Sequence, residues 1–231
     1  MFFKWCVGIF PNTFAARFRI IINNGDAIML IRVTDCESPL WKQAVEIVKS
    51  KFQSSYKATI EPNPQYFALT QDEDERIMSC AGITFGDHRT LFSEQYLSRP
   101  IHEILSERHG QQIDRSSIVE IGSLVSHHVT AGVIMVNMIP LLAWCMGAQY
   151  LLCTVTPRVR EMMESCQIVF EPLLTADPTL LSEDGGKNWG SYYAKRPITG
   201  FIKVDPQRSR FAAMTLGTLF NHLPVQARVT Q

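Results

Sequence analysis

The sequence lacks an excess of charge of either sign. Its 22 Lys and Arg residues balance its 22 Asp and Glu residues, so the formal net charge at pH 7 is zero. It also contains no run of five or more like charges. A chain without a strong positive field has no general attraction for nucleic acid or for anionic membranes. The composition therefore argues against a nucleic-acid-binding protein and against a charged, disordered tail.

The cysteines lack the paired spacing of metal sites and disulfide frameworks. No two of them form a C-x-x-C motif, and all stand in apolar surroundings. The six are Cys6, Cys36, Cys80, Cys145, Cys153 and Cys166. Structural zinc sites normally use close cysteine or histidine pairs. We therefore expect reduced core cysteines, no metal site and a cytoplasmic location.

The pattern also predicts no membrane-spanning helix. The longest apolar run, residues 131–155, is interrupted by Asn137, Pro140 and a turn signal at Gly147. Because this turn divides the run into two elements of ordinary length, we expect a core helix followed by a core strand. Residues 1–18 have no convincing small-residue cleavage site, so we interpret them as part of the mature protein.

The stretch from 116 to 156 organises the rest of the chain. Residues 118–126, IVEIGSLVS, have the β-branched and apolar character of a buried strand, with one acid, Glu120, inside it. Small and polar residues then open a helical run, and residues 150–155 return to strand character. A unit of this kind places the free N–H groups of a helix start beside the end of a strand. We therefore expect a ligand phosphate to bind there.

Turn and capping signals predict the elements on either side. The Asn23–Asp26 turn joins two strand-like runs into a hairpin. Ser38 is the N-cap and Pro39 the first residue of a helix that ends near residue 56. Further strands are expected at 66–70, 77–85, 167–173 and about 198–204, and further helices from Pro100 to Gly110, after Thr156–Pro157 and at 208–220. This order predicts an α/β fold with a mixed sheet, helices on both faces and a ligand where two neighbouring strands diverge.

Four motifs resemble the thermostable hemolysin family. They are LFSEQYL (91–97), IVEIGSLVS (118–126), GAQYLLCTVTPRVR (147–160) and WGSYY (189–193). The similarity covers most of the chain from about 33 to 204. That family is similar in turn to the acyl-homoserine-lactone synthases and to the wider GNAT acyltransferase fold. The resemblance implies a mixed, mostly antiparallel sheet whose central strands splay apart to admit the pantetheine arm of an acyl-CoA or acyl carrier protein.

The resemblance also suggests how the chain is divided. We expect a single GNAT-like domain over residues 1–231, with 1–35 as an N-terminal hairpin extension and 205–231 as a C-terminal tail. Two departures limit what the resemblance implies. The GNAT diphosphate signature, Q/R-x-x-G-x-G/A, is missing after Ser126, which favours acyl carrier protein as a donor beside acyl-CoA. The arginine that follows the strand glutamate in the lactone synthases is also missing, so recognition of their methionine-derived substrate is not implied.

Glu120 is the strongest catalytic candidate. Burying a carboxylate in an apolar strand costs free energy unless the group is paired or used, and burial raises its pKa toward proton-transfer chemistry. We expect it to take a proton from an attacking amine, directly or through a water. The alternative is that strand alternation turns Glu120 toward solvent or toward a structural arginine such as Arg115. Glu94 is the second acid, with a catalytic or amine-binding role or, alternatively, a position on the surface.

The remaining candidates form a cofactor group and an aromatic group. In the cofactor group, the strand end pairs with the pantetheine amides, and a helix start capped by Thr130 contacts a phosphate. Its members are Leu124, Val125, Ser126, His127, His128, Thr130, Ala131 and Gly132. In the aromatic group, Tyr96, Trp189 and Tyr192 bind the substrate, and Tyr193 or Tyr192 lines an acyl tunnel or protonates the leaving thiolate. The alternative for the aromatic group is a packed corner without chemistry. Two adjacent histidines alone make no metal site.

These candidates predict an N-acyltransferase. It would transfer a fatty acyl group from acyl carrier protein or acyl-CoA to the amine of a small molecule such as an amino acid or its derivative. Two alternatives come from other classes: a membrane-active cytolysin and a non-catalytic acyl-binding protein. The expected partners are the amine substrate and an acyl carrier protein, without nucleic acid, and the oligomeric state is not predicted.

Overall fold

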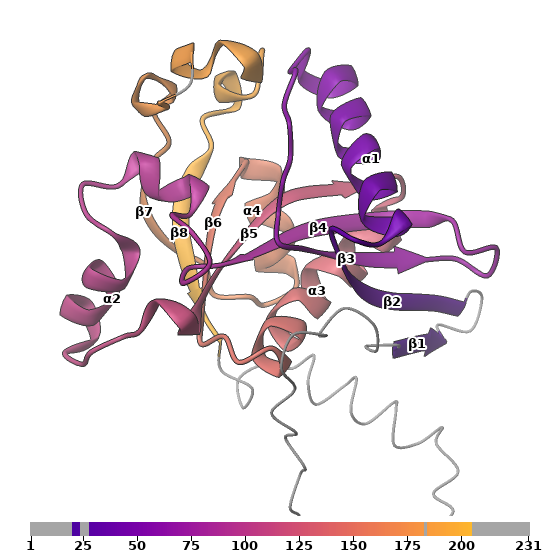
Figure 1. Cartoon of the computed structure of the whole chain (residues 1–231), viewed down its shortest axis with the longest axis horizontal. Coiled ribbons are helices and arrows are strands. Elements are labelled where there is room, and N and C mark those ends of the chain that lie inside the picture. The colour runs from indigo at the N-terminus through magenta and orange to yellow at the C-terminus, as the bar shows by residue number, and fades with distance from the viewer. Residues whose placement is uncertain (1–19, 24–27, 183, 205–231) are drawn as a thin grey trace, which may run out of the picture.

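A computed structural model describes residues 20–23, 28–182 and 184–204 (Figure 1). Its centre is one sheet of eight strands in the order β1-β2-β3-β4-β5-β6-β8-β7. The strands are β1 (Ile20–Asn23), β2 (Ile28–Asp35), β3 (Tyr66–Gln71), β4 (Ile77–Phe85), β5 (Ile118–Ser126), β6 (Tyr150–Val155), β7 (Glu171–Thr175) and β8 (Ile198–Lys203). Neighbouring strands are antiparallel except for the parallel pair β5 and β6. The predicted mixed, mostly antiparallel sheet is confirmed.

Helices cover both faces of this sheet (Figure 1). The α-helices are α1 (Pro39–Tyr56), α2 (Ile101–His109), α3 (Val129–Cys145) and α4 (Pro157–Ser165). The short 3₁₀ helices are η1 (Phe92–Tyr96), η2 (Arg115–Ser117), η3 (Pro178–Leu180), η4 (Asp184–Trp189) and η5 (Tyr193–Lys195). Strand alternation decides which helix each side chain meets. Val119 and Leu151 pack in the core that contains α3 and α4, whereas Ile118 and Leu152 pack in the core that contains α2.

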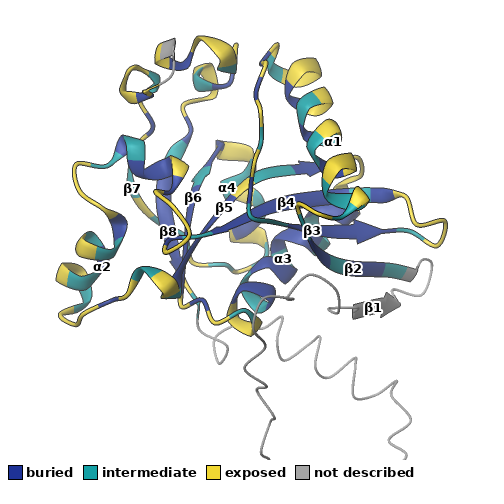
Figure 2. Ribbon diagram, in the orientation of Figure 1, coloured by how far each residue is buried: buried dark blue, intermediate teal, exposed yellow. Residues whose placement is uncertain are grey.

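The sheet is the most continuously buried layer of the molecule, as Figure 2 shows. On α1, Ala44, Val48 and Phe52 face the sheet, and the opposite side of the helix is exposed. This helix begins as predicted, because the Ser38 hydroxyl accepts a hydrogen bond from the backbone N–H of Leu40 at 3.2 Å. The helix predicted at Pro100 is α2, and Gly110 ends it in the left-handed conformation with φ 64°.

The N-terminal strands belong to the same sheet as the rest. β1 and β2 are antiparallel, as the hairpin prediction requires, although the turn between them and residues 1–19 lie outside the described residues. β2 then pairs with β3 from Leu30 to Asp35. The helix predicted at 208–220 also lies outside the described residues. The division into a domain, an extension and a tail stays a prediction.

Three local predictions are wrong. Strand β7 begins at Glu171 rather than at 167, because Gln167 adopts a left-handed φ of 58° and closes the end of α4. Helix α3 begins at Val129 with His128 as its N-cap residue, so Thr130 lies inside the first turn and is not the cap. The cysteines are not all in the core. Cys80 and Cys153 are buried, but Cys36 and Cys145 are exposed.

The apolar run at 131–155 has the predicted division. It forms α3 and then β6, with Gly147 at a φ of 93° in the connection between them. Ala131, Met135 and Met138 on α3 are fully buried against the sheet. None of the described helices is both long and apolar enough to cross a membrane.

The central strands β5 and β6 separate halfway along their length. They pair from Ile118 to Ile121 on β5 and from Tyr150 to Cys153 on β6. Beyond these pairs, β5 continues beside β4 and β6 continues beside β8. A bulge lies at this point of β5, where two residues oppose one on β4 and Ser123 has a φ of 52°. Because a bulge bends its strand and increases the local twist, it turns β5 away from β6. The predicted splay of the central strands is confirmed.

Candidate active site

The divergence of β5 and β6 opens a cleft through the sheet. Residues 121–126 of β5 form one edge, and residues 153–156 at the end of β6 form the other. Phe52 and Tyr56 of α1 border the cleft on one face of the sheet, and α3 and α4 border it on the other. Its enclosed volume is about 170 Å³. The walls are mainly apolar, which is typical of a small-molecule site.

The β5 edge of this cleft has backbone groups available for a ligand. From Gly122 to Ser126 the strand pairs with β4 on one side, and it has no pairing with β6 on the other. Ser123 carries a side chain at a φ that favours glycine. Non-glycine residues held in this conformation cluster at functional sites because the surrounding structure must stabilise them. The edge is therefore suited to pairing with the amides of an extended ligand.

Two helices begin beside the open end of the cleft. Helix α3 follows β5, and α4 follows β6 after the N-cap Thr156; neither has a side-chain hydrogen bond at its cap. Of the predicted cofactor group, Leu124, Val125 and Ser126 line the cleft. The others lie beside it: His127, His128 and Thr130 are exposed, and Ala131 and Gly132 are buried in the first turn of α3.

Glu120 lies in the paired part of β5 and holds η1 against the sheet. Its carboxylate accepts hydrogen bonds from the Phe92 backbone N–H at 2.7 Å, and from the backbone N–H and hydroxyl of Ser93 at 2.8 and 2.6 Å. Glu120 is only 8 % exposed. Burial raises its pKa, and the three donors partly oppose this effect. Glu120 therefore faces neither solvent nor Arg115, and it does not line the cleft. Its role as a base stays a prediction.

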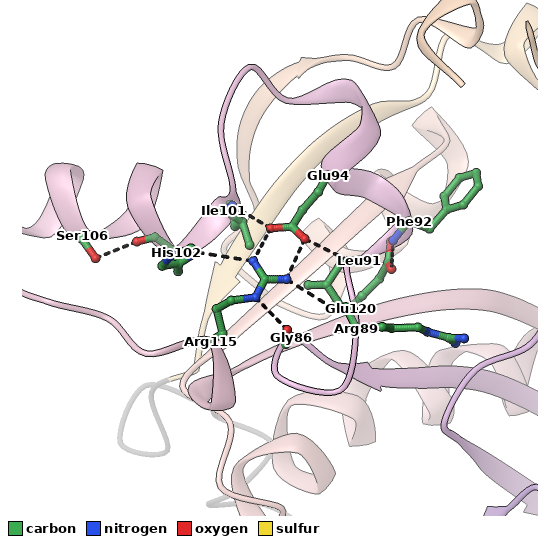
Figure 3. A network of polar contacts seen from close by, with 10 residues as sticks. All are labelled: Gly86, Arg89, Leu91, Phe92, Glu94, Ile101, His102, Ser106, Arg115 and Glu120. Carbon is green, nitrogen blue, oxygen red and sulfur yellow. Dashed lines mark hydrogen bonds and ion pairs between the residues drawn. The ribbon is translucent and has the colours of Figure 1, made fainter. Parts of the chain in front are cut away.

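Glu94 forms a buried ion pair with Arg115 (Figure 3). The two guanidinium Nη atoms donate to its oxygens at 2.7 and 2.8 Å, and the backbone N–H groups of Leu91 and Ile101 each donate at 2.9 Å. A carboxylate has about four acceptor positions, so all are occupied. Burial would raise the pKa of Glu94, but Arg115 and the two N–H groups outweigh it and hold the pKa below its usual value. The alternative that Glu94 lies on the surface is wrong, because its side chain is buried. Its catalytic or amine-binding role stays a prediction.

A chain of hydroxyl groups connects Glu120 with the cleft. The Ser93 hydroxyl lies 2.6 Å from the Glu120 carboxylate and 2.8 Å from the Thr154 hydroxyl. Thr154 belongs to β6 and lines the cleft. Its hydroxyl also lies 2.7 Å from that of Thr199 on β8. Ser93, Thr154 and Thr199 were not among the residues predicted for the site. Thr154 could have been found as Glu120 was, because it is a polar residue inside an apolar strand, YLLCTV (150–155).

The aromatic residues form a continuous cluster on the α1 side of the cleft. Neighbouring rings lie 5.2 to 6.4 Å apart between centroids. The members are Phe52, Tyr56, Phe92, Tyr96, Trp189, Tyr192 and Tyr193. The predicted packed corner is therefore present. Three members of the cluster also border the cleft: Phe52, Tyr56 and, of the residues predicted for the site, Tyr192. Its hydroxyl donates to the Thr154 carbonyl at 3.4 Å, and burial raises its pKa.

The other predicted aromatic site residues stand behind Tyr192. The hydroxyls of Tyr96 and Tyr193 lie 2.5 Å apart. Tyr96 is 3 % exposed, and burial raises its pKa. The Trp189 ring packs in a tilted orientation against the rings of Phe92 and Tyr192, with centroids at 5.3 and 5.2 Å. None of these three residues (Tyr96, Trp189 and Tyr193) lines the cleft.

Comparison with known proteins agrees with this architecture. The family model described as thermostable hemolysin matches residues 34–207. No curated protein matches the chain in sequence. Among solved structures, the N-acyl amino acid synthase FeeM from uncultured soil microbes is 12 % identical, covers 86 % of this chain and 100 % of its own, and has a TM-score of 0.54.

Two other solved structures share the fold. The AHL synthase LasI is 11 % identical, over 80 % of this chain and 94 % of its own, with a TM-score of 0.53. The CoA-dependent acyl-homoserine lactone synthase BjaI, solved with SAM and isopentyl-CoA, is 11 % identical, over 82 % of this chain and 90 % of its own, with a TM-score of 0.51. At these identities the similarity shows the GNAT-like fold and leaves activity to the site itself.

Proposed function

Because this chain belongs to the thermostable hemolysin family and has a GNAT-like fold, we propose that it is an N-acyltransferase. It transfers an acyl group from the thioester of a phosphopantetheine arm, on CoA or on acyl carrier protein, to the amine of a small molecule such as an amino acid. The cleft between β5 and β6 carries this proposal. In the reaction the amine nitrogen attacks the thioester carbonyl, the C–S bond breaks, the thiolate gains a proton and the amine loses one.

The β5 edge and the helix starts support the choice of donor. The two amide groups of a pantetheine arm can form hydrogen bonds with the free backbone edge of β5 from Gly122 to Ser126, as an added strand would. The unpaired N–H groups at the start of α3 then face a phosphate at the open end of the cleft. This arrangement serves one phosphate, and it is compatible with either donor.

The apolar walls support a hydrocarbon chain as the transferred group. Val136 and Ile139 of α3 and Val159 and Met163 of α4 line the same cleft. The enclosed volume of about 170 Å³ is smaller than the roughly 300–1,000 Å³ of typical ligand pockets. We therefore expect short acyl chains to fit directly and longer chains to require movement of Met163, whose side chain is flexible.

Tyr192 is the group best placed to protonate the leaving thiolate. It combines a position on the cleft wall with a protonated hydroxyl, which donates to the Thr154 carbonyl in the same wall. Tyr193, the other tyrosine expected in this role from the sequence, instead bonds the Tyr96 hydroxyl and lies off the cleft. We therefore assign the acid role to Tyr192 and the base role to Glu120.

An assay of thiol release tests the function. Purified protein is incubated with acetyl-, octanoyl- or palmitoyl-CoA, or with octanoyl acyl carrier protein, and with an equimolar mixture of the twenty common amino acids. We expect thiol release that depends on the amino acids, and N-acyl amino acids in the mass spectrum. Absence of such products with every donor would refute the proposal. Donor binding without turnover would instead identify an acyl-binding protein, and leakage of pure lipid vesicles without a donor would identify a cytolysin.

A further inference from the structure

Glu120 does not reach the cleft in which the acceptor amine would bind. It does not line the cleft, and Ser93 of η1 lies between it and Thr154. Ser93 is 2 % exposed and Glu120 is 8 % exposed, whereas Thr154 is partly exposed. A base in this position cannot take a proton from a substrate directly. Any proton that reaches it must pass through the groups that contact it.

The hydrogen bonds around Glu120 have a fixed direction when the carboxylate is ionised. The backbone N–H groups of Phe92 and Ser93 can only donate, and an ionised carboxylate can only accept. The Ser93 hydroxyl therefore donates to Glu120 and accepts from Thr154, which in turn accepts from Thr199. Each hydroxyl has two lone pairs, so the Thr154 oxygen keeps one acceptor position for a proton from the cleft.

We propose that the hydroxyls of Thr154 and Ser93 form a relay that carries the proton of the acceptor amine from the cleft to Glu120. This inference rests on the proposed function. The amine that attacks is neutral, and the proton that its nitrogen loses on forming the amide balances the proton that the thiolate gains. The relay acts before this step: one N–H proton of the protonated amine passes to the Thr154 oxygen, the Thr154 proton passes to the Ser93 oxygen, and the Ser93 proton passes to the Glu120 carboxylate. One proton leaves the amine and one arrives at Glu120, so both hydroxyls are regenerated. Their hydrogen bonds now point in the opposite direction.

The surroundings of Glu120 support a group that exchanges one proton. Burial raises its pKa, and Glu94 raises it further through like charge, whereas Ser93 and Phe92 stabilise the ionised form. The charge of Glu120 also acts on two neighbouring titratable groups, Tyr96 on η1 and Cys153 on β6. Both keep their protons, because burial raises their pKa values. The protonated state also has a partner, since a Glu120 proton can be donated to the Ser93 oxygen.

Substitution of the relay hydroxyls is a sharper test than substitution of Glu120. In Glu120→Gln the amide nitrogen would replace one of two oxygens that each accept a backbone N–H, so an unpaired donor would disturb η1. Thr154→Val and Ser93→Ala remove the relay and keep the carboxylate. The matched control is Thr70→Val, which removes a buried hydroxyl bonded to Ser79 at 2.6 Å, in β3 and outside the cleft lining.

The experiment compares two kinds of acceptor with octanoyl-CoA as donor. The amino-acid mixture consists of protonated amines at neutral pH, and methoxyamine is an acceptor that is already unprotonated there. For Thr154→Val and Ser93→Ala we expect kcat with the amino acids to fall about 10²–10⁴-fold at neutral pH, as for loss of a general base. We also expect kcat to recover as the pH rises, and methoxyamine to react at nearly the wild-type rate. Thr70→Val should match the wild type with both acceptors.

Three outcomes would overturn the relay. In the first, Thr154→Val retains the wild-type rate and pH profile with the amino acids. In the second, it loses activity equally with both acceptors, which indicates a structural role for the hydroxyl. The third is an inactive wild-type protein with every acceptor, which would refute the proposed function itself. Circular dichroism of each variant shows whether the fold is retained.

Discussion

The buried ion pair between Arg115 and Glu94 provides the strongest test of how η1 is held. Arg115 also donates from Nε to the Gly86 carbonyl at 2.7 Å, so one side chain joins the end of β4, η1 and η2. Replacement by methionine keeps the length of the side chain and removes every one of these donors. The change leaves Glu94 buried without its counter-charge, with a side-chain exposure of 5 %.

The expected loss of stability follows from that burial. Removing one partner of a buried ion pair typically costs about 3–5 kcal/mol, because the remaining charge stays desolvated. Arg115 keeps 26 % of its side-chain surface exposed, so the lower end, about 3 kcal/mol, is expected for Arg115→Met. With a urea m-value of about 1–3 kcal/mol/M, this corresponds to a fall of about 1–3 M in the unfolding midpoint. Tryptophan fluorescence during urea titration measures it.

The pH dependence provides a second readout with a defined sign. The pKa of Glu94 is lower in the folded protein than in the unfolded chain, so the folded state binds fewer protons. Its contribution to stability is therefore complete above the unfolded pKa and is lost as the pH falls through the folded pKa. Arg115→Met should flatten this acid limb of the stability curve, because the arginine is the main group that lowers the Glu94 pKa.

The matched control is Arg99→Met. Arg99 pairs with Glu107 on the surface, where both side chains are about half exposed or more, and such pairs contribute little. We expect its urea midpoint to stay near that of the wild type. If Arg115→Met shifts the midpoint no more than Arg99→Met does, the ion pair does not hold η1 and the reasoning fails.

Three further predictions concern the cleft and the scaffold. Tyr192→Phe should lower kcat by about 10²-fold with little change in KM, as for loss of a general acid, whereas Tyr193→Phe should affect kcat less; equal losses would contradict the assignment. Met163→Trp should fill the cleft and raise the preference for acetyl-CoA over octanoyl-CoA, measured as the ratio of kcat/KM; an unchanged ratio would place the acyl chain elsewhere. Ser38→Ala should destabilise the protein by about 1 kcal/mol through loss of the α1 cap, and a thermal melt without any fall in Tm would contradict this.

Much of the architecture could be predicted from the sequence because its signals are local. Ser38 and Pro39 mark the start of α1, Gly110 marks the end of α2, and the apolar run at 118–126 is β5 with the predicted bounds. Capping, positive φ and strand periodicity each depend on a few neighbouring residues. The same locality explains the error at β7, since Gln167 has no sequence signal for its left-handed conformation.

The site depended on contacts between distant segments, and here the sequence determined the residue types but not their partners. It identified Glu120 and Glu94 as unusual acids, yet only the tertiary structure decided that Arg115 pairs with Glu94. Ser93 and Thr154 are 61 residues apart in the chain, and their contact exists because η1 packs over the end of β6. Burial and hydrogen bonding of a side chain are set by what packs against it, and no local pattern records that. Periodicity therefore placed Glu120 on a strand, and the packing of η1 decided that its carboxylate contacts Phe92 and Ser93 instead of solvent.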